Sequence, residues 1–254
     1  MQLDWTTTYA AIWRQRKEYL RPVKNCDPVS LQDLLGIEEQ QQKLQENTER
    51  FLNGEAANNA LLWGARGTGK SSLVKAIFNA YVDQGLRLIE VDKDDLIYLP
   101  EIVDEIRDLP QKFIIFCDDL SFSEEERNYK HLKSVLEGSV EVSPSNVLLY
   151  ATSNRRHLLP EMAKENLGTK VVDGELHYTD AVEEKISLSD RFGLWLSFYP
   201  GTMDQYLAIV DSLFSDYSGD RKKLHEAAKL FALARATHSG RTARQFFQSY
   251  STDR

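Results

Sequence analysis

The first part of the chain carries aromatic residues at a helical spacing. Over residues 3–20, Trp5, Tyr9 and Trp13 recur with charged residues between them, which is typical of an amphipathic helix. We expect this helix to end before Pro22 and to be followed by a linker. Its aromatic stripe would either pack on the chain's own core or dock a partner or another subunit, and such stripes usually face a core.

Short apolar runs alternate with helical patterns in the middle of the chain. A helix is predicted over residues 37–52, with Gly54 at its end. Strands are predicted at Leu61–Trp63, Arg87–Val91, Phe113–Cys117, Val147–Ala151 and Leu194–Phe198. Because strands separated by helical stretches indicate βαβ units, we expect an α/β fold with a parallel five-stranded sheet flanked by helices.

The pattern becomes helical after Pro200. Thr202 and Gln205 match a capping box, so a helix is expected to start there and to end near Phe214. Two further helices are predicted, over about residues 220–237 and from Arg241 onwards. The chain is therefore divided into an N-terminal helix and linker (1–30), an α/β core (31–199) and a small helical lid (200–254).

Composition narrows the class of protein without identifying it. The 254 residues carry a net charge of -8, which argues against nucleic acid as the main partner because phosphate-backbone binding uses clustered Lys and Arg. No apolar stretch approaches the ~20 residues that span a bilayer, and the first residues do not resemble a signal peptide. Cys26 and Cys117 are too few for a disulfide framework. We expect a reduced, cytoplasmic protein without a membrane segment.

A glycine-rich loop joins the first predicted strand to a helix and matches the pattern G-x-x-x-x-G-K-[ST]. Glycines let backbone N–H groups converge on phosphate oxygens, and the helix that follows presents unpaired N–H groups. Lys70 would reach the β- and γ-phosphates, and Ser71 would coordinate Mg²⁺. A turn without a ligand is the alternative, but the strand before and the helix after favour a nucleotide site. The predicted nucleotide-binding residues are Gly64, Ala65, Arg66, Gly67, Thr68, Gly69, Lys70, Ser71 and Ser72.

Two carboxylates follow the apolar strand 113–117. In a P-loop fold such a strand runs beside the P-loop strand and delivers its acid to the Mg²⁺ site. Asp118 would then hold the metal together with Ser71, and Asp119 would orient the attacking water. The alternative is a polar cap at a strand end. Many ATPases of this kind carry Asp-Glu here, so the shorter Asp119 predicts slow hydrolysis.

With these two motifs the chain resembles AAA+ P-loop ATPases, and other segments extend the likeness. Residues 148–154 are similar to the AAA+ strand that ends in a polar sensor. The resemblance implies that Asn154 lies between Asp118 and the γ-phosphate and helps to position water. An asparagine in a turn is the alternative. Leu34–Ile37 resembles the AAA+ stretch that packs near the adenine.

The segment Leu188–Leu194 is similar to the one that carries the AAA+ arginine finger. The resemblance implies that Arg191 reaches into the ATP site of a neighbouring subunit, where a guanidinium offsets charge on the transferred phosphoryl group. Alternatively, Arg191 is a surface residue paired with Asp190 or Glu184. The finger hypothesis predicts a homo-oligomer, because a second subunit must complete the site.

The start of the last helix, Ser239-Gly240-Arg241, resembles the AAA+ sensor 2. Arg241 would then contact the γ-phosphate of its own subunit and couple the lid to the nucleotide state. Arg244, one turn later, is the alternative for this role.

The whole sequence is most similar to a bacterial family of predicted AAA+ ATPases called domain of unknown function 815, with distant similarity to replication initiators and helicase loaders. The resemblance covers roughly residues 30–250. The DNA-binding helix-turn-helix domain of the initiators has no counterpart in this sequence, so a direct DNA role is not implied. A predicted hairpin around Asp173-Gly174, within residues 160–185, would either engage a substrate or neighbour or form a surface feature.

These observations support two main functions. The first is an ATP hydrolase with ATP and Mg²⁺ bound, whose nucleotide state drives assembly or remodelling of a macromolecule, with a protein partner favoured over nucleic acid. The second is an ATP-gated interaction module with negligible hydrolysis. A small-molecule phosphotransferase using the same loop is a third reading, which the sensor-like and finger-like segments disfavour.

Overall fold

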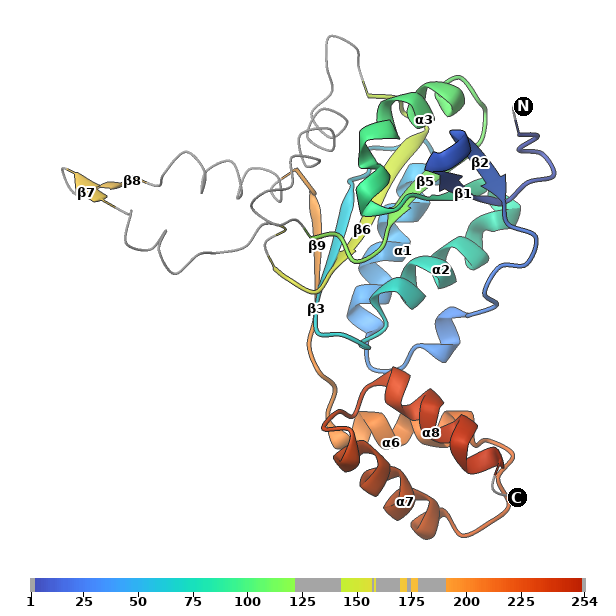
Figure 1. Cartoon of the computed structure of the whole chain (residues 1–254), viewed down its shortest axis with the longest axis vertical. Coiled ribbons are helices and arrows are strands. Elements are labelled where there is room, and N and C mark those ends of the chain that lie inside the picture. Colours follow the sequence, from blue (N-terminus) through green and yellow to red (C-terminus); the bar gives the residue numbers. More distant parts are fainter. Residues whose placement is uncertain are drawn as a thin grey trace.

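A central sheet with helices on both faces forms the larger part of the molecule, and a cluster of helices adjoins it (Figure 1). The computed structural model describes residues 3–121, 143–156, 158, 170–172, 175–177 and 191–252. No helix in these ranges is both long and apolar enough to cross a membrane.

The sheet of the described chain has seven strands in the order β2-β1-β4-β5-β6-β3-β9. Its strands are β1 (Ala10–Arg14), β2 (Tyr19–Pro22), β3 (Ala60–Gly64), β4 (Leu86–Glu90), β5 (Lys112–Cys117), β6 (Val147–Ser153) and β9 (Leu194–Phe198). Neighbouring strands are parallel except β1 and β2, which are antiparallel. The five predicted strands and the α/β fold are confirmed, but the predicted strand number is wrong because β1 and β2 extend the sheet beside β4.

The helix predicted over residues 3–20 is also wrong. Strand β1 pairs in parallel with β4, with Ala11 opposite Ile89, and then turns back through η1 (Gln15–Lys17) into β2. A spacing of four residues between aromatic side chains fits the two-residue period of a strand as well as a helical turn. Pairing with β4 also satisfies backbone groups that this edge would otherwise expose.

Two aromatic side chains of this N-terminal segment, Trp5 and Trp13, pack on the chain's own core. Trp5 is 4% exposed, and its ring meets that of Phe113 edge-on with centroids 5.0 Å apart. The Trp5 carbonyl accepts a hydrogen bond from Arg87 Nε at 2.8 Å. Trp13 is equally buried and lies against Tyr98. The core-packing interpretation of the stripe is therefore confirmed for these two tryptophans.

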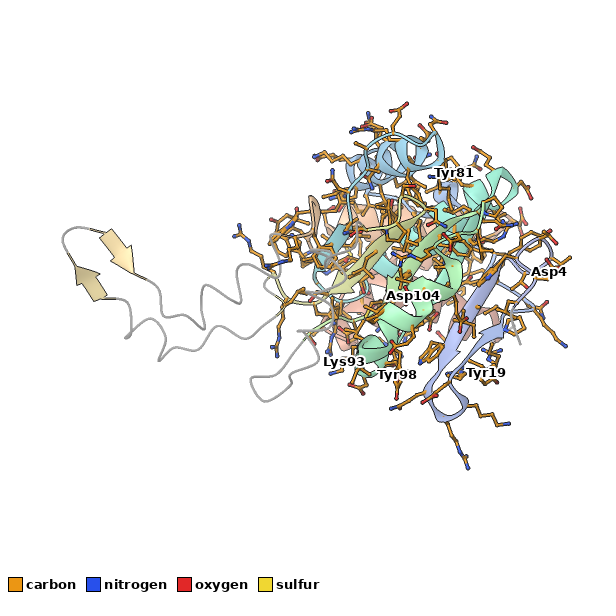
Figure 2. The ribbon with its side chains drawn as sticks, turned by 90° about the horizontal axis from the view of Figure 1, so that it is seen from above. Asp4, Tyr19, Tyr81, Lys93, Tyr98 and Asp104 are labelled. Atoms are coloured by element: carbon orange, nitrogen blue, oxygen red, sulfur yellow. The ribbon has the colours of Figure 1, made fainter. Side chains whose placement is uncertain are left out.

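Replacing Trp5 with alanine is expected to lower the free energy of unfolding by about 3–5 kcal/mol, because it removes a buried aromatic ring. Tyr19→Ala on the β1–β2 hairpin that follows is the control: Tyr19 is 40% exposed, and its loss should cost less than about 1 kcal/mol. Figure 2 shows this hairpin, with Tyr19, along one edge of the molecule. Denaturant unfolding measures both changes. Equal midpoints for wild type and Trp5→Ala would contradict the packing described here.

Two layers of helices bury the faces of the sheet. Helices α1 (Glu38–Leu52) and α2 (Lys70–Tyr81) pack on one face through residues such as Leu44 and Ile77, whereas α3 (Leu99–Ile106) covers the other through Ile102. The prediction of a helix over 37–52 is confirmed. Short 3-10 helices lie at Leu31–Asp33, Val82–Gln84 and Lys93–Tyr98.

The helical cluster at the carboxyl end has its own small core. It consists, in the described chain, of α6 (Met203–Leu213), α7 (Arg221–Ala234) and α8 (Gly240–Thr252). Tyr206 and Leu224 are fully buried between these helices. The capping box is present, with Thr202 Oγ1 accepting from the Gln205 amide. The predicted lid helices are thus confirmed, whereas the division of the chain at residue 200 stays a prediction.

A separate hairpin pairs β7 (Lys170–Val172) with β8 (Glu175–His177) in antiparallel register. This confirms the two strands predicted around Asp173-Gly174. The turn residues themselves, and most of the segment 160–185, lie outside the described residues.

Candidate functional site

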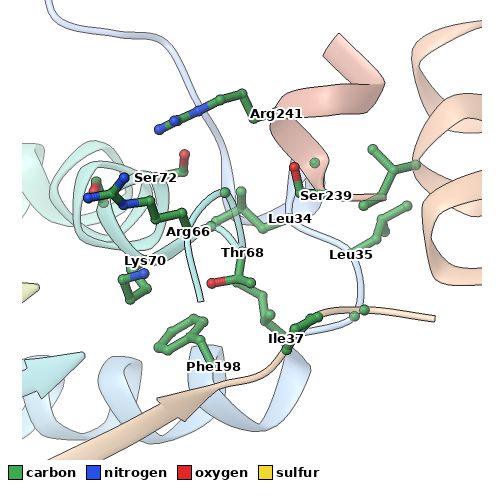
Figure 3. A pocket seen from close by; sticks show the side chains of 18 of the residues that line it. Leu34, Leu35, Ile37, Arg66, Thr68, Lys70, Ser72, Phe198, Ser239 and Arg241 are labelled. Carbon is green, nitrogen blue, oxygen red and sulfur yellow. The ribbon is translucent and has the colours of Figure 1, made fainter. Parts of the chain in front are cut away.

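The loop between β3 and α2 lies at the carboxyl end of the sheet (Figure 3). Gly64 leaves the strand with φ +133°, and a Cβ there would lie 1.9 Å from the Phe198 carbonyl oxygen. Gly67 has φ +77°, and a Cβ there would lie 2.7 Å from Ser239 Oγ of the lid. Only glycine fits these two positions, because the loop lies close to β9 on one side and to the lid on the other.

Helix α2 begins directly after this loop. Its first backbone bond joins the Leu73 amide to the Gly69 carbonyl at 2.8 Å. The first N–H groups of any helix lack intrahelical partners and carry a partial positive charge. The start of α2 therefore offers donors for an anion at the mouth of the loop.

The Lys70 side chain is folded back onto the loop and is only 7% exposed. Its ammonium donates to the carbonyl oxygens of Gly64 at 2.9 Å and Ala65 at 2.7 Å, and to Asn154 Oδ1 at 3.2 Å. Burial lowers the pKa of this ammonium, and the nearby acidic side chains oppose that effect. The arrangement holds one positive charge at a fixed place with little water around it.

The two carboxylates that follow β5 meet groups from neighbouring elements. Ser71 Oγ, in the first turn of α2, donates to Asp118 Oδ1 at 2.6 Å. Asn154 Nδ2, at the end of β6, donates to Asp119 Oδ1 at 2.5 Å. Because the carboxyl ends of parallel strands meet at one edge of a sheet, three segments far apart in sequence converge here. The structure brings these predicted site residues together with Lys70.

A cavity of about 830 Å³ opens beside this polar cluster. This volume lies within the range of small-molecule sites. The polar part of its lining includes the glycine-rich loop, the two carboxylates and Asn154. The apolar part includes Leu34, Leu35, Ile37, Phe198, Tyr199 and Ile209. The cavity thus offers a ligand both anion-binding groups and apolar contacts.

The sequence matches the model of one protein family, described as protein of unknown function (DUF815), over residues 6–254. The chain belongs to this family. A search of curated proteins found no significant match.

The DUF815 chain is also similar to solved structures. A DNA replication initiation factor superposes with a TM-score of 0.54 at 17% identity, covering 89% of this chain and 65% of its own. A point mutant of Thermotoga maritima RuvB gives a TM-score of 0.49 at 13% identity, covering 87% of this chain and 72% of its own. The mostly parallel sheet flanked by helices is the AAA+ P-loop NTPase fold.

Three arginines of the DUF815 chain lie around the cavity. Arg66 of the loop and both Arg241 and Arg244 of α8 line it. Figure 3 shows Arg241 reaching from α8 over the loop that carries Arg66. The structure therefore brings both candidates for the sensor 2 role to the site, and the choice of Arg241 stays a prediction.

Arg191 lies elsewhere in the DUF815 fold. It precedes β9, whose Leu194 is level with Ala60 and whose Phe198 is level with Gly64 at the loop. At about 3.3 Å per residue, the start of β9 is more than ~13 Å from the loop end of the sheet. Arg191 is half-buried and does not line the cavity of its own chain. Asp190 and Glu184, its proposed surface partners, lie outside the described residues.

One residue of this site was missed in the sequence. Thr152 of β6 is 1% exposed, and its hydroxyl donates to Asp118 Oδ1 at 2.5 Å and accepts from the Asp119 amide at 2.9 Å. A polar residue near the end of a mostly apolar strand, two positions before Asn154, was the available signal. Its partners became visible only with the register between β5 and β6.

Proposed function

We propose that this protein binds ATP with Mg²⁺ in the cavity and hydrolyses ATP slowly, at a site completed by Arg191 of a neighbouring copy. Nucleotide state would drive assembly or remodelling of a macromolecular partner. The observation that carries the proposal is the single cluster formed by Lys70, Ser71, Asp118 and Asn154 in the lining of a nucleotide-sized cavity.

The polar and apolar parts of the cavity lining have complementary tasks in nucleotide binding. The start of α2 and the Lys70 ammonium would receive the phosphates, helped by Arg66 and Arg241. The apolar side chains of the lining, which include Leu34 and Ile37, would cover the base. Because lid and core both line the cavity, a bound nucleotide would favour one relative position of the two.

The oxygen atoms of Ser71 and Asp118 fit a magnesium ion. They lie 2.6 Å apart, at the start of α2 and directly after the end of β5, and oxygen is the ligand that Mg²⁺ prefers. No group of three or more His, Cys, Asp or Glu side chains in the described chain could hold a metal ion. The ion would therefore share phosphate oxygens of the nucleotide, as is common for Mg²⁺. When bound, it neutralises charge on those oxygens.

Asp119 and Asn154 are the groups proposed to act on water. Asn154 fixes one carboxylate oxygen of Asp119, so that the carboxylate presents a defined orientation for accepting a proton from water. Asn154 also accepts from Lys70, which links the water-orienting group to the phosphate-binding one. Loss of the γ-phosphate would therefore affect both Lys70 and Asp119.

The position of Arg191 supports a shared active site and a homo-oligomer. Since it lies at the far end of β9, it can serve an ATP site only in another copy of the chain. The same observation favours the second candidate, an ATP-gated interaction module that hydrolyses negligibly until it assembles. The net charge of -8 favours a protein partner over nucleic acid. The unpaired Cys26 and Cys117 favour a reducing compartment, the cytoplasm.

Turnover across a wide range of protein concentration tests the proposal. We expect the ATPase rate per subunit to rise with concentration, because association completes the site. Light scattering in ATP and in ADP should show larger particles in ATP. A rate per subunit that stays near zero, with a monomer in both nucleotides, would favour the gated module instead.

A further inference from the structure

Thr152 occupies the centre of the sheet at its carboxyl end. Strand β6 lies between β5 and β3, and Thr152 is level with Leu62 of β3. Its side chain is 1% exposed. A polar group buried to this degree is costly unless it is hydrogen-bonded, so the partners of its hydroxyl indicate why it is there.

Thr152 binds three successive residues beyond the end of β5. Its hydroxyl donates to Asp118 Oδ1 at 2.5 Å and accepts from the Asp119 amide at 2.9 Å. Its carbonyl accepts from the Leu120 amide at 2.6 Å. The regular pairing of β5 with β6 ends at Cys117 opposite Ala151. These three bonds therefore replace the sheet ladder at the point where the chain leaves the strand.

The bonds hold an unusual backbone conformation at Asp119. This residue has φ +53°, in the left-handed region that non-glycine residues seldom adopt. Such a conformation persists when the surrounding structure fixes it. With Asp119 turned in this way, its carboxylate meets Asn154, while the carboxylate of Asp118 meets Ser71.

We propose that Thr152 is a positioning residue whose one hydroxyl directs both carboxylates, Asp118 toward the metal and Asp119 toward the water. The left-handed turn at Asp119 accompanies the contact of its carboxylate with Asn154. The inference rests on the proposed ATPase function, because the metal and the water belong to that reaction. The inference goes beyond that function by assigning a role to Thr152, whose hydroxyl would act on the metal and the water through Asp118 and Asp119.

The test compares Thr152→Val, which removes the hydroxyl at nearly equal volume, with Thr152→Ser, which keeps it. In Thr152→Val we expect the Mg²⁺ concentration that half-saturates turnover to rise, and single-turnover hydrolysis to fall, each by about 10–100-fold, as for other groups that orient metal ligands. Binding of ATP in EDTA should be unchanged. Thr152→Ser should restore both quantities to within about threefold of wild type.

Thr48→Val is the matched control for stability. Thr48 is also fully buried, and its hydroxyl binds Tyr150 and the Leu44 carbonyl rather than the site. It should lower the melting temperature without changing the Mg²⁺ requirement. If Thr152→Val matches wild type in rate and Mg²⁺ requirement, or if Thr152→Ser is as impaired as Thr152→Val, the hydroxyl does not act as proposed.

Hydrogen exchange at the Asp119 amide separates this inference from the proposed function. The exchange is measured by NMR without nucleotide, so it does not depend on ATPase activity. In Thr152→Val this amide should exchange at least about tenfold faster than in wild type, because it loses the acceptor at 2.9 Å and keeps only the longer contact with Asp118 Oδ1 at 3.2 Å. If wild type fails to bind ATP but the amide of Asp119 exchanges faster in Thr152→Val than in wild type, the proposed function is wrong and the positioning by Thr152 stands. Unchanged exchange overturns the positioning itself.

Discussion

An Arg191→Ala variant is expected to bind ATP as tightly as wild type and to lose turnover by about 10³-fold or more, the effect typical of an arginine supplied by a second subunit. Binding is spared because Arg191 does not line the cavity of its own chain. Turnover is lost because the guanidinium would act only on the charge that develops during phosphoryl transfer. Equilibrium titration with a fluorescent ATP analogue and steady-state turnover measure the two quantities.

Mixing two inactive variants makes the test specific for a shared site. Lys70→Ala subunits keep Arg191, and Arg191→Ala subunits keep an intact loop, so a mixed assembly would contain some complete sites. We expect the mixture to recover part of the turnover that neither variant shows alone. Arg16→Ala, an exposed arginine on the N-terminal hairpin, is the control and should turn over as wild type. Wild-type turnover by Arg191→Ala would show that the shared-site mechanism is wrong.

The parts of the site that lie close together in sequence were predictable. The glycine-rich loop, Lys70 and Ser71 form one uninterrupted pattern, and its chemistry follows from residue types alone. Asp118 follows from the apolar strand before it, since a parallel sheet places strand ends at one edge. The structure brings these residues to one cavity, where their roles toward ATP and Mg²⁺ stay predictions.

What could not be predicted depends on contacts between distant segments. Thr152 acquires its partners through the register of β6 against β5, which no local pattern specifies. The N-terminal strand β1 forms because β4 presents an edge to pair with, whereas the spacing of the aromatic residues in and before β1 fits both a helix and a strand. Arg241 and Arg244 differ by one helical turn, so both reach the cavity and the sequence does not separate them.

Lys70→Ala is expected to lower ATP affinity by at least about 100-fold, which corresponds to roughly 3 kcal/mol for the loss of a buried, paired charge. The side chain is 7% exposed and lies among the loop carbonyls and Asn154. Water would therefore not substitute for the interaction of its ammonium with the phosphates. Calorimetric titration with ATP measures the change. Lys43→Ala removes an exposed lysine paired with Glu39 on α1 and is the control, with unchanged affinity expected.

Lys70→Ala should leave the fold intact, so a loss of ATP affinity can be assigned to the binding site. Burial lowers the pKa of the Lys70 ammonium, which means that the folded chain disfavours the charged form that is present at neutral pH. Removing this charge therefore relieves a desolvation cost and offsets the loss of its hydrogen bonds to Gly64 and Ala65. We expect a melting temperature close to that of wild type. If Lys70→Ala still bound ATP with wild-type affinity, the glycine-rich loop would not be the phosphate site.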